Sequence, residues 1–274
     1  MLGNVDAGNL TNIPGVDLNL LMNFLLDFFL VSLRLGALLV SSPIFGARSV
    51  PVRVRVLLTF VISAAYYGSV SVPNFENLPF LALIRVMGVE VAIGLTGGIV
   101  LTILFASVAL AGEKIAASGG LGFAAQVDPN SGGQTPVVSQ FLTLFLLTMF
   151  LSANGHLRLI EGLRQSFDII PMGQPVSLMA MSQFVIDIGG EMFYLGALLM
   201  LPVVSILLLV NVTIGVVTRS APALNFFSFG FPLTMMALFI VMYIYTKPLG
   251  FAIEDLSYYT IEVFERLFLE LRDG

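Results

Sequence analysis

The sequence predicts an all-α polytopic membrane protein of about six apolar helical segments, two of them long and broken into bent hairpins, with a C-terminal amphipathic helix. Hydrophobic residues make up 57% of the 274 residues and charged residues only 11%, whereas about 25% of the residues in a soluble domain are charged. The mean hydropathy is +0.98. A single water-soluble core cannot bury that much apolar surface, so we expect the chain to lie in a membrane and not to be an enzyme.

Three counts exclude whole classes of function. The chain has no cysteine, which excludes disulfides, thiol nucleophiles and thiolate-bound metals. Its single histidine, His156, excludes a metal site built from several imidazoles. The net charge of −5 argues against nucleic acid as a partner, because phosphate binding needs a basic patch. We therefore expect no metal, no other cofactor and no nucleic acid.

Apolar runs of about 20 residues predict membrane-spanning helices, because a helix rises about 1.5 Å per residue and must cross about 30 Å of hydrocarbon. Six runs qualify, at residues 20–43, 54–73, 78–111, 135–157, 180–217 and 226–247. The turns between them are rich in Pro, Gly, Asn and Ser, which favour turns. We treat residues 1–274 as a single membrane domain.

Two of these runs are too long for one straight crossing. As single helices, residues 78–111 would reach roughly 50 Å and residues 180–217 nearly 60 Å. Each run contains residues that permit a bend or break, namely Gly94, Gly97 and Gly98 in the first and Gly189, Gly190 and Pro202 in the second. Both runs are therefore predicted to be bent, folded into short hairpins or buried against partner subunits. The small residues from Gly94 to Gly98 also predict close helix packing.

The segment after the sixth run differs in character. Apolar residues recur at helical spacing through residues 251–272, among several glutamates and aspartates. This pattern predicts an amphipathic helix. Because anionic lipid surfaces attract basic helices and not acidic ones, we expect its apolar face to pack on a protein partner, in preference to the alternative of a frayed, solvated tail.

Five charged residues fall inside the apolar runs, where charge is costly and therefore a candidate for function. They are Arg34, Arg85, Glu90, Asp187 and Glu191. One interpretation is a proton- or sodium-coupled secondary transporter that uses the carboxylates as a relay. The other is structural: the arginines neutralise carboxylates of neighbouring helices, including helices of other subunits. No repeated half with matching broken segments is visible, which favours the structural interpretation.

Residues 112–136 form the longest weakly apolar stretch. Its glycines match neither a P-loop nor a dinucleotide-binding spacing, so we expect no cofactor there. The part from Ala116 to Ala125 is small and mildly apolar, with Phe123 as its one bulky side chain. It is either an ordinary surface loop or, where it dips into a watery cavity at membrane depth, a movable plug.

An ordered set of short strings carries a family resemblance from about residue 20 to residue 250. The strings are Phe45-Gly46, Val50-Pro51, Gly112-Glu113, Gly120-Leu121, Asp128-Pro129, Asn154-Gly155-His156, Thr218-Arg219-Ser220-Ala221-Pro222-Ala223-Leu224-Asn225 and Phe231-Pro232-Leu233. In this order and spacing the chain resembles the FliR family, the export-gate membrane proteins of the bacterial flagellar type III secretion system. The injectisome counterparts are similar.

The resemblance implies a non-enzymatic, pore-forming subunit in the inner membrane at the flagellar basal body. Its implied partners are FliP, FliQ and FlhB, with membrane lipid around them and unfolded flagellar proteins as cargo. Residues 1–205 would correspond to a FliP-like part, 206–250 to a FliQ-like hairpin and 251–274 to a tail. The implied plug loop contains Ala116, Gly119, Gly120, Leu121, Gly122 and Phe123, and the implied cytoplasmic hairpin tip contains Arg219, Pro222 and Asn225. The five buried charges would then make contacts between subunits.

Overall fold

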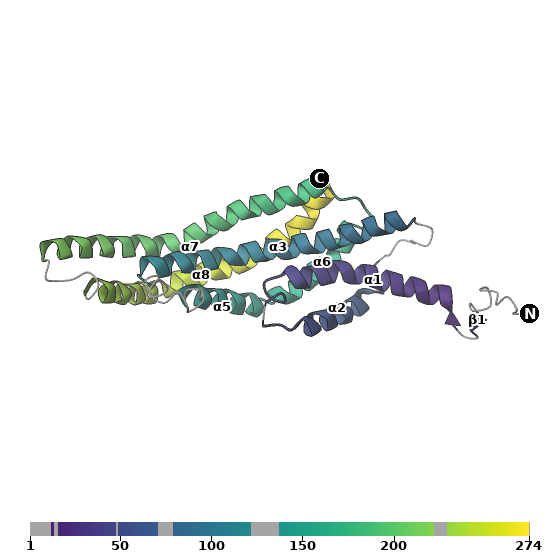
Figure 1. Cartoon of the computed structure of the whole chain (residues 1–274), viewed down its shortest axis with the longest axis horizontal. Coiled ribbons are helices and arrows are strands. Elements are labelled where there is room, and N and C mark those ends of the chain that lie inside the picture. The colour runs from purple at the N-terminus through teal and green to yellow at the C-terminus, as the bar shows by residue number, and fades with distance from the viewer. Residues whose placement is uncertain are drawn as a thin grey trace, which may run out of the picture. The chain divides into compact units, whose positions relative to one another are not determined.

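The computed structural model is built almost entirely of helices (Figure 1). It describes residues 12–13, 16–47, 49–70, 79–121, 137–221 and 229–273. The helices in this part of the chain are α1 (Leu18–Ser41), α2 (Val52–Tyr66), α3 (Phe80–Ser118), α5 (Val137–Ser152), α6 (Gly155–Ile169), α7 (Leu178–Ser220) and α8 (Phe231–Asp273). The predicted all-α membrane class is confirmed.

A short antiparallel pair of strands precedes α1 and was not predicted. Strands β1 (Asn12–Ile13) and β2 (Val16–Asp17) pair with Asn12 opposite Asp17. Two residues per strand are too few for an apolar and polar alternation to be read from the sequence.

Four helices are long and apolar enough to cross a membrane: α1 over Phe24–Ser41, then α3, α7 and α8. Helices α5 and α6 form a fifth candidate if the bent pair counts as one span. The six runs therefore do not become six crossings. The second run, 54–73, yields only the 15-residue α2, which reaches about 22 Å and falls short of the hydrocarbon thickness.

The prediction that the two long runs fold into hairpins is wrong, because each run forms one continuous helix. Helix α3 has 39 residues and α7 has 43. A glycine inside a helix costs only about 0.5–1 kcal/mol, which tertiary packing can offset. Pro202 lies inside α7, and Figure 1 shows that this helix bends near its middle without ending, as expected where proline removes one backbone hydrogen bond.

The fourth run, 135–157, ends in a sharp bend that divides it between two helices. Helices α5 and α6 meet at an angle of 65°, and Asn154 between them has a φ of 55°. Asparagine tolerates this left-handed conformation better than most residues. The next residue must be small for another reason: a Cβ on Gly155 would lie 2.6 Å from the ring of Phe150.

The sixth run and the C-terminal segment are not separate elements, because α8 runs through both with Pro248 inside it. The apolar face of the C-terminal segment is already buried within the chain, at Ile253, Phe264, Leu267 and Phe268. The expectation that this face packs on a partner is therefore wrong. Its exposed remainder consists mainly of polar and charged residues, with Phe251, Tyr258 and Leu269 as exceptions.

The described residues fall into two compact units, which share their long helices. The first draws on Met1–Ile99, Ile160–Met181 and Leu267–Gly274, and the second on Val100–Leu159 and Ser182–Arg266. In the first unit, α1 and α2 are joined by an aromatic stack of Phe28 on Phe60, with centroids 5.6 Å apart. In the second, Phe105 of α3 meets Phe150 of α5 edge to face at 5.5 Å.

Candidate functional site

Close packing of α1 against α3 positions the charged centre of the first unit. A Cβ on Gly94 would overlap the carbonyl oxygen of Arg34 and lie 2.8 Å from the Cβ of Ala37. One turn along α3, a Cβ on Gly98 would overlap the side chain of Ser41. The small-residue packing predicted from Gly94 to Gly98 is therefore confirmed, because only glycine lets the two backbones approach this closely.

Arg34 of α1 is fully buried, and each of its three side-chain nitrogens donates a hydrogen bond. Its Nε donates to Oε2 of Glu90 on α3 at 2.7 Å, and its Nη1 donates to the hydroxyl of Ser166 on α6 at 3.0 Å. Its Nη2 donates to the carbonyl of Ile170 at 3.1 Å. The guanidinium carbon also lies 4.2 Å from the ring centroid of Phe167, within cation–π distance.

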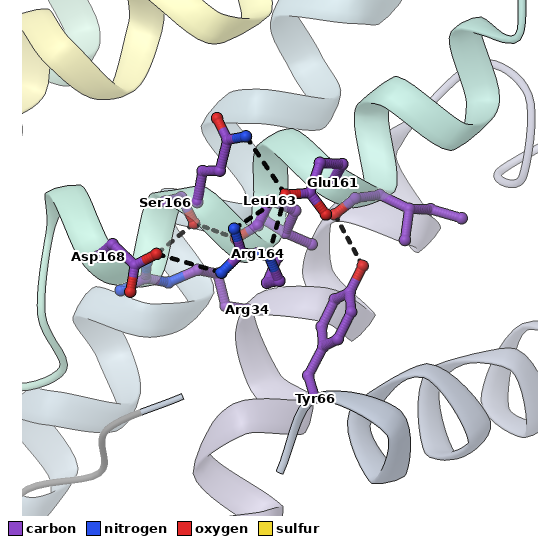
Figure 2. A network of polar contacts seen from close by, with 9 residues as sticks. Arg34, Tyr66, Glu161, Leu163, Arg164, Ser166 and Asp168 are labelled. Carbon is purple, nitrogen blue, oxygen red and sulfur yellow. Dashed lines mark hydrogen bonds and ion pairs between the residues drawn. The ribbon is translucent and has the colours of Figure 1, made fainter. Parts of the chain in front are cut away.

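The Arg34–Glu90 pair therefore ties three helices together inside the first unit. Both side chains are at most 1% exposed. The hydroxyl of Ser166 in turn donates to the carbonyl of Leu163 at 2.6 Å, as Figure 2 shows. The other carboxylate oxygen of Glu90, Oε1, is buried without a hydrogen-bond partner in the described part of the chain. Losing Arg34 would leave this carboxylate wholly uncompensated.

Helix α6 presents a charged outer face on the side away from Arg34. Arg164 bridges Glu161 at 2.9 Å and Asp168 at 3.2 Å (Figure 2). The hydroxyl of Tyr66 on α2 donates to the carbonyl of Ile160 at 3.1 Å and fixes the start of this face. Exposed charges are costly against hydrocarbon, so this face of the unit requires water or a polar partner.

The remaining predicted charges do not join the Arg34 pair in the described contacts. Arg85 and Asp187 are exposed. Glu191 on α7 is partly buried and accepts a short hydrogen bond from the hydroxyl of Tyr259 on α8. Arg266 approaches the same carboxylate at 3.9 Å. The two predicted carboxylates of α7, Asp187 and Glu191, thus have different surroundings.

The predicted plug loop begins later than the sequence indicated. Ala116 is a buried residue of α3, which continues to Ser118. The helix then ends in a Schellman turn: the amide of Leu121 donates to the carbonyl of Ala116 at 3.0 Å, and the amide of Gly120 donates to Ala117 at 3.1 Å. Gly120 has a φ of +84°, which glycine adopts without strain. Gly122 and Phe123 lie outside the described residues.

The end of α3 is held by two polar residues that sequence reasoning missed. Asn211 on α7 donates from Nδ2 to the carbonyl of Ser118 at 3.0 Å, and its Oδ1 accepts from the hydroxyl of Thr234 on α8 at 3.3 Å. The available signal was an asparagine inside a strongly apolar helix, which contains an 18-residue stretch with a mean hydropathy of 2.6. Such a group must find a partner.

The predicted hairpin tip is only partly described. Arg219 is exposed in the last turn of α7, where a cation interacts favourably with the helix dipole. Pro222 and Asn225 lie outside the described residues.

Comparisons with known proteins identify the family. The sequence profile described as bacterial export proteins, family 1, matches residues 25–258. The flagellar biosynthetic protein FliR of Escherichia coli (strain K12) is 36% identical over 209 residues, which cover 76% of this chain and 79% of that protein. The chain belongs to the FliR family. The FliR of Bacillus subtilis (strain 168) is 29% identical over 253 residues, 90% of this chain and 97% of its own length.

A third FliR, from Pectobacterium carotovorum subsp. carotovorum, is 32% identical over 219 residues, 78% of this chain and 82% of that protein. Together with the apolar helices, these relatives identify the chain as a membrane-embedded flagellar export protein. The predicted resemblance to the FliR family is confirmed.

Proposed function

We propose that this chain is a pore-forming subunit of the flagellar type III export gate, through which unfolded flagellar proteins pass, and that residues 119–123 help to close the idle pore. The observation that carries the proposal is the family match over residues 25–258. The subunit acts without catalysis, in the inner membrane at the basal body, and assembles with FliP, FliQ and FlhB.

The exposed apolar surface of the long helices supports assembly with other membrane subunits. Only 22% of the most apolar 18-residue stretch of α7 is buried within the chain, and only 17% of the corresponding stretch of α8. Phe193, Tyr194 and Leu209 of α7 and Tyr243 of α8 are each more than 60% exposed. Apolar surface of this extent requires lipid or protein neighbours.

The end of α3 supports a closing role for the segment that follows. A channel wide enough for an unfolded chain would leak ions, so it needs a barrier when idle. Gly119 and Gly120 are buried, and the Schellman turn with its bond from Asn211 gives the segment a defined starting point. The cytoplasmic hairpin tip around Arg219 fits the FliQ-like part of the chain.

The arrangement of carboxylates does not favour the alternative, a secondary transporter. Glu90 is sealed from solvent and bound to Arg34, and Asp187 is exposed without a described carboxylate partner on another helix. A relay needs groups that a cation can reach in turn.

Deleting residues 119–123 tests the closing role. We expect the assembled gate, reconstituted in proteoliposomes, to leak potassium ions, because the barrier is lost while α3 stays intact to Ser118. The control is Glu113→Gln, because Glu113 is an exposed residue of the same helix. This variant should leak no more than the wild type. Equal, low leakage from the deletion variant and the wild type would refute the closing role.

Purification from native membranes tests the assembly. The chain should co-purify with two smaller membrane proteins, identified by mass spectrometry, whereas a transporter should purify alone or as a homo-oligomer. The double variant Asp187→Asn with Glu191→Gln should weaken assembly. It should not change ion-coupled solute transport, because an export-gate subunit carries out no such transport. Recovery of a stable, solitary chain would contradict the proposal.

A further inference from the structure

The C-terminal end of α3 can be accounted for carbonyl by carbonyl. The last carbonyls of a helix have no partner within the helix and must be satisfied elsewhere. Gly119 donates to the carbonyl of Ile115 at 3.0 Å, and the Schellman turn satisfies those of Ala116 and Ala117. The carbonyl of Ser118 receives its bond from the side chain of Asn211, at 3.0 Å. The backbone turn and one side chain of α7 therefore complete the end of this helix together.

The amide of Asn211 has only one orientation that satisfies both of its contacts. The Ser118 carbonyl can only accept, so the NH₂ group must face it. The amide oxygen then faces the hydroxyl of Thr234 at 3.3 Å. That hydroxyl also lies 2.8 Å from the carbonyl of Gly230, so it divides its one proton between two acceptors. Asn211 thereby links α3, α7 and α8 through a single side chain.

Packing reinforces this link on the α8 side. A Cβ on Gly119 would lie 2.6 Å from Cδ2 of Leu238, and a Cβ on Gly120 would lie 3.3 Å from the ring of Phe231. Real Cβ atoms do not approach as closely as the first distance, so any larger residue at position 119 would force the side chain of Leu238 to move. Ser118 is thus bonded to α7, and Gly119 and Gly120 lie close against side chains of α8.

We propose that Asn211 is the positioning residue of the closing segment: its amide holds the end of α3 on α7 and α8 and so sets the point from which the chain beyond Leu121 departs. This inference rests on the proposed function. It assigns a role in sealing to a residue of α7 that lies far from the loop in sequence and carries no charge.

Substitutions at Asn211 separate positioning from general stability. Asn211→Asp keeps the acceptor for Thr234 and removes the donor to Ser118, Asn211→Leu removes both, and Asn211→Gln keeps both on a longer stem. The measurement is potassium leakage from proteoliposomes per assembled gate complex, with the complex quantified by size-exclusion chromatography. We expect the Asp and Leu variants to leak about tenfold more than the wild type, the factor that follows from losing one hydrogen bond to a buried group. The Gln variant should leak less than the Asp variant.

Thr213→Val is the matched control. Thr213 lies two residues away on the exposed side of α7, and its hydroxyl donates to the carbonyl of Leu209 in the same helix at 2.8 Å. This variant should seal like the wild type. If Asn211→Leu does not assemble, Asn211→Asp and Thr234→Val carry the test, because both nearly preserve volume: the first loses the bond to Ser118, and the second loses the hydroxyl that contacts Asn211 and Gly230.

The outcomes distinguish this inference from the proposed function. A leaking 119–123 deletion together with a tight Asn211→Asp gate would overturn the positioning role and leave the closing segment in place. Leakage equal in Asn211→Asp and Thr213→Val would also overturn it, since the effect would then follow from any polar loss on α7. A tight gate in the deletion variant would overturn both.

Discussion

Removal of Arg34 should destabilise this protein more than removal of any surface arginine. Arg34→Met keeps most of the side-chain length but removes the bond to Glu90 at 2.7 Å and the bonds to Ser166 and Ile170. Glu90 is then a buried carboxylate with no compensating charge, which costs about 3–5 kcal/mol. At about 2–4 °C per kcal/mol for a chain of this size, the midpoint of thermal unfolding should fall by roughly 6–20 °C.

The double variant gives the sharper result. Arg34→Met combined with Glu90→Leu removes both charges at once, and well-packed apolar replacements of a buried pair are often neutral or stabilising. We therefore expect the double variant to be more stable than Arg34→Met alone, with a coupling energy above about 2 kcal/mol. The assay is the fraction of purified gate complex that remains soluble and assembled after heating, measured by size-exclusion chromatography.

Arg164→Ala is the matched control, because Arg164 lies on the same unit and also bridges two carboxylates, but at the surface. Its removal should leave the midpoint unchanged within error, since exposed ion pairs contribute little. Equal losses for Arg34→Met and Arg164→Ala would show that burial does not set the strength of the pair. Additive losses in the double variant would show that the two charges do not interact, and either result would refute the reasoning.

Two further substitutions test helix contacts in the first unit by the same heating assay. Gly94→Ala should destabilise the protein by about 1–3 kcal/mol, because its Cβ has no room against α1. A Cβ on Gly88 of the same helix meets no atom within 4 Å, so Gly88→Ala should be neutral or slightly stabilising. Equal effects of the two substitutions would contradict the close approach of α1 and α3. Tyr66→Phe should cost about 1 kcal/mol by removing the bond to the carbonyl of Ile160, and an unchanged midpoint would show that this bond contributes nothing to stability.

The element pattern was predictable because hydrophobic runs and glycine spacing are local properties. The runs located five of the seven described helices to within a few residues at their starts, and the small residues from Gly94 to Gly98 predicted a close helix contact, which the structure shows to be with α1. The predicted breaks failed because glycine and proline only lower the stability of a helix locally. Whether the helix ends there depends on what packs against it.

The sequence also nominated Arg34 and Glu90 as costly buried charges, and the composition by itself required a membrane protein. It left open which groups those charges meet, and it gave Asn211 no role. Ser166 and Ile170 lie more than 130 positions from Arg34, and Ser118 lies 93 positions from Asn211. Only the tertiary structure decides such pairings, because a buried polar group bonds to whatever the folded chain brings within about 3 Å of it, and hydrophobic periodicity carries no information about that choice.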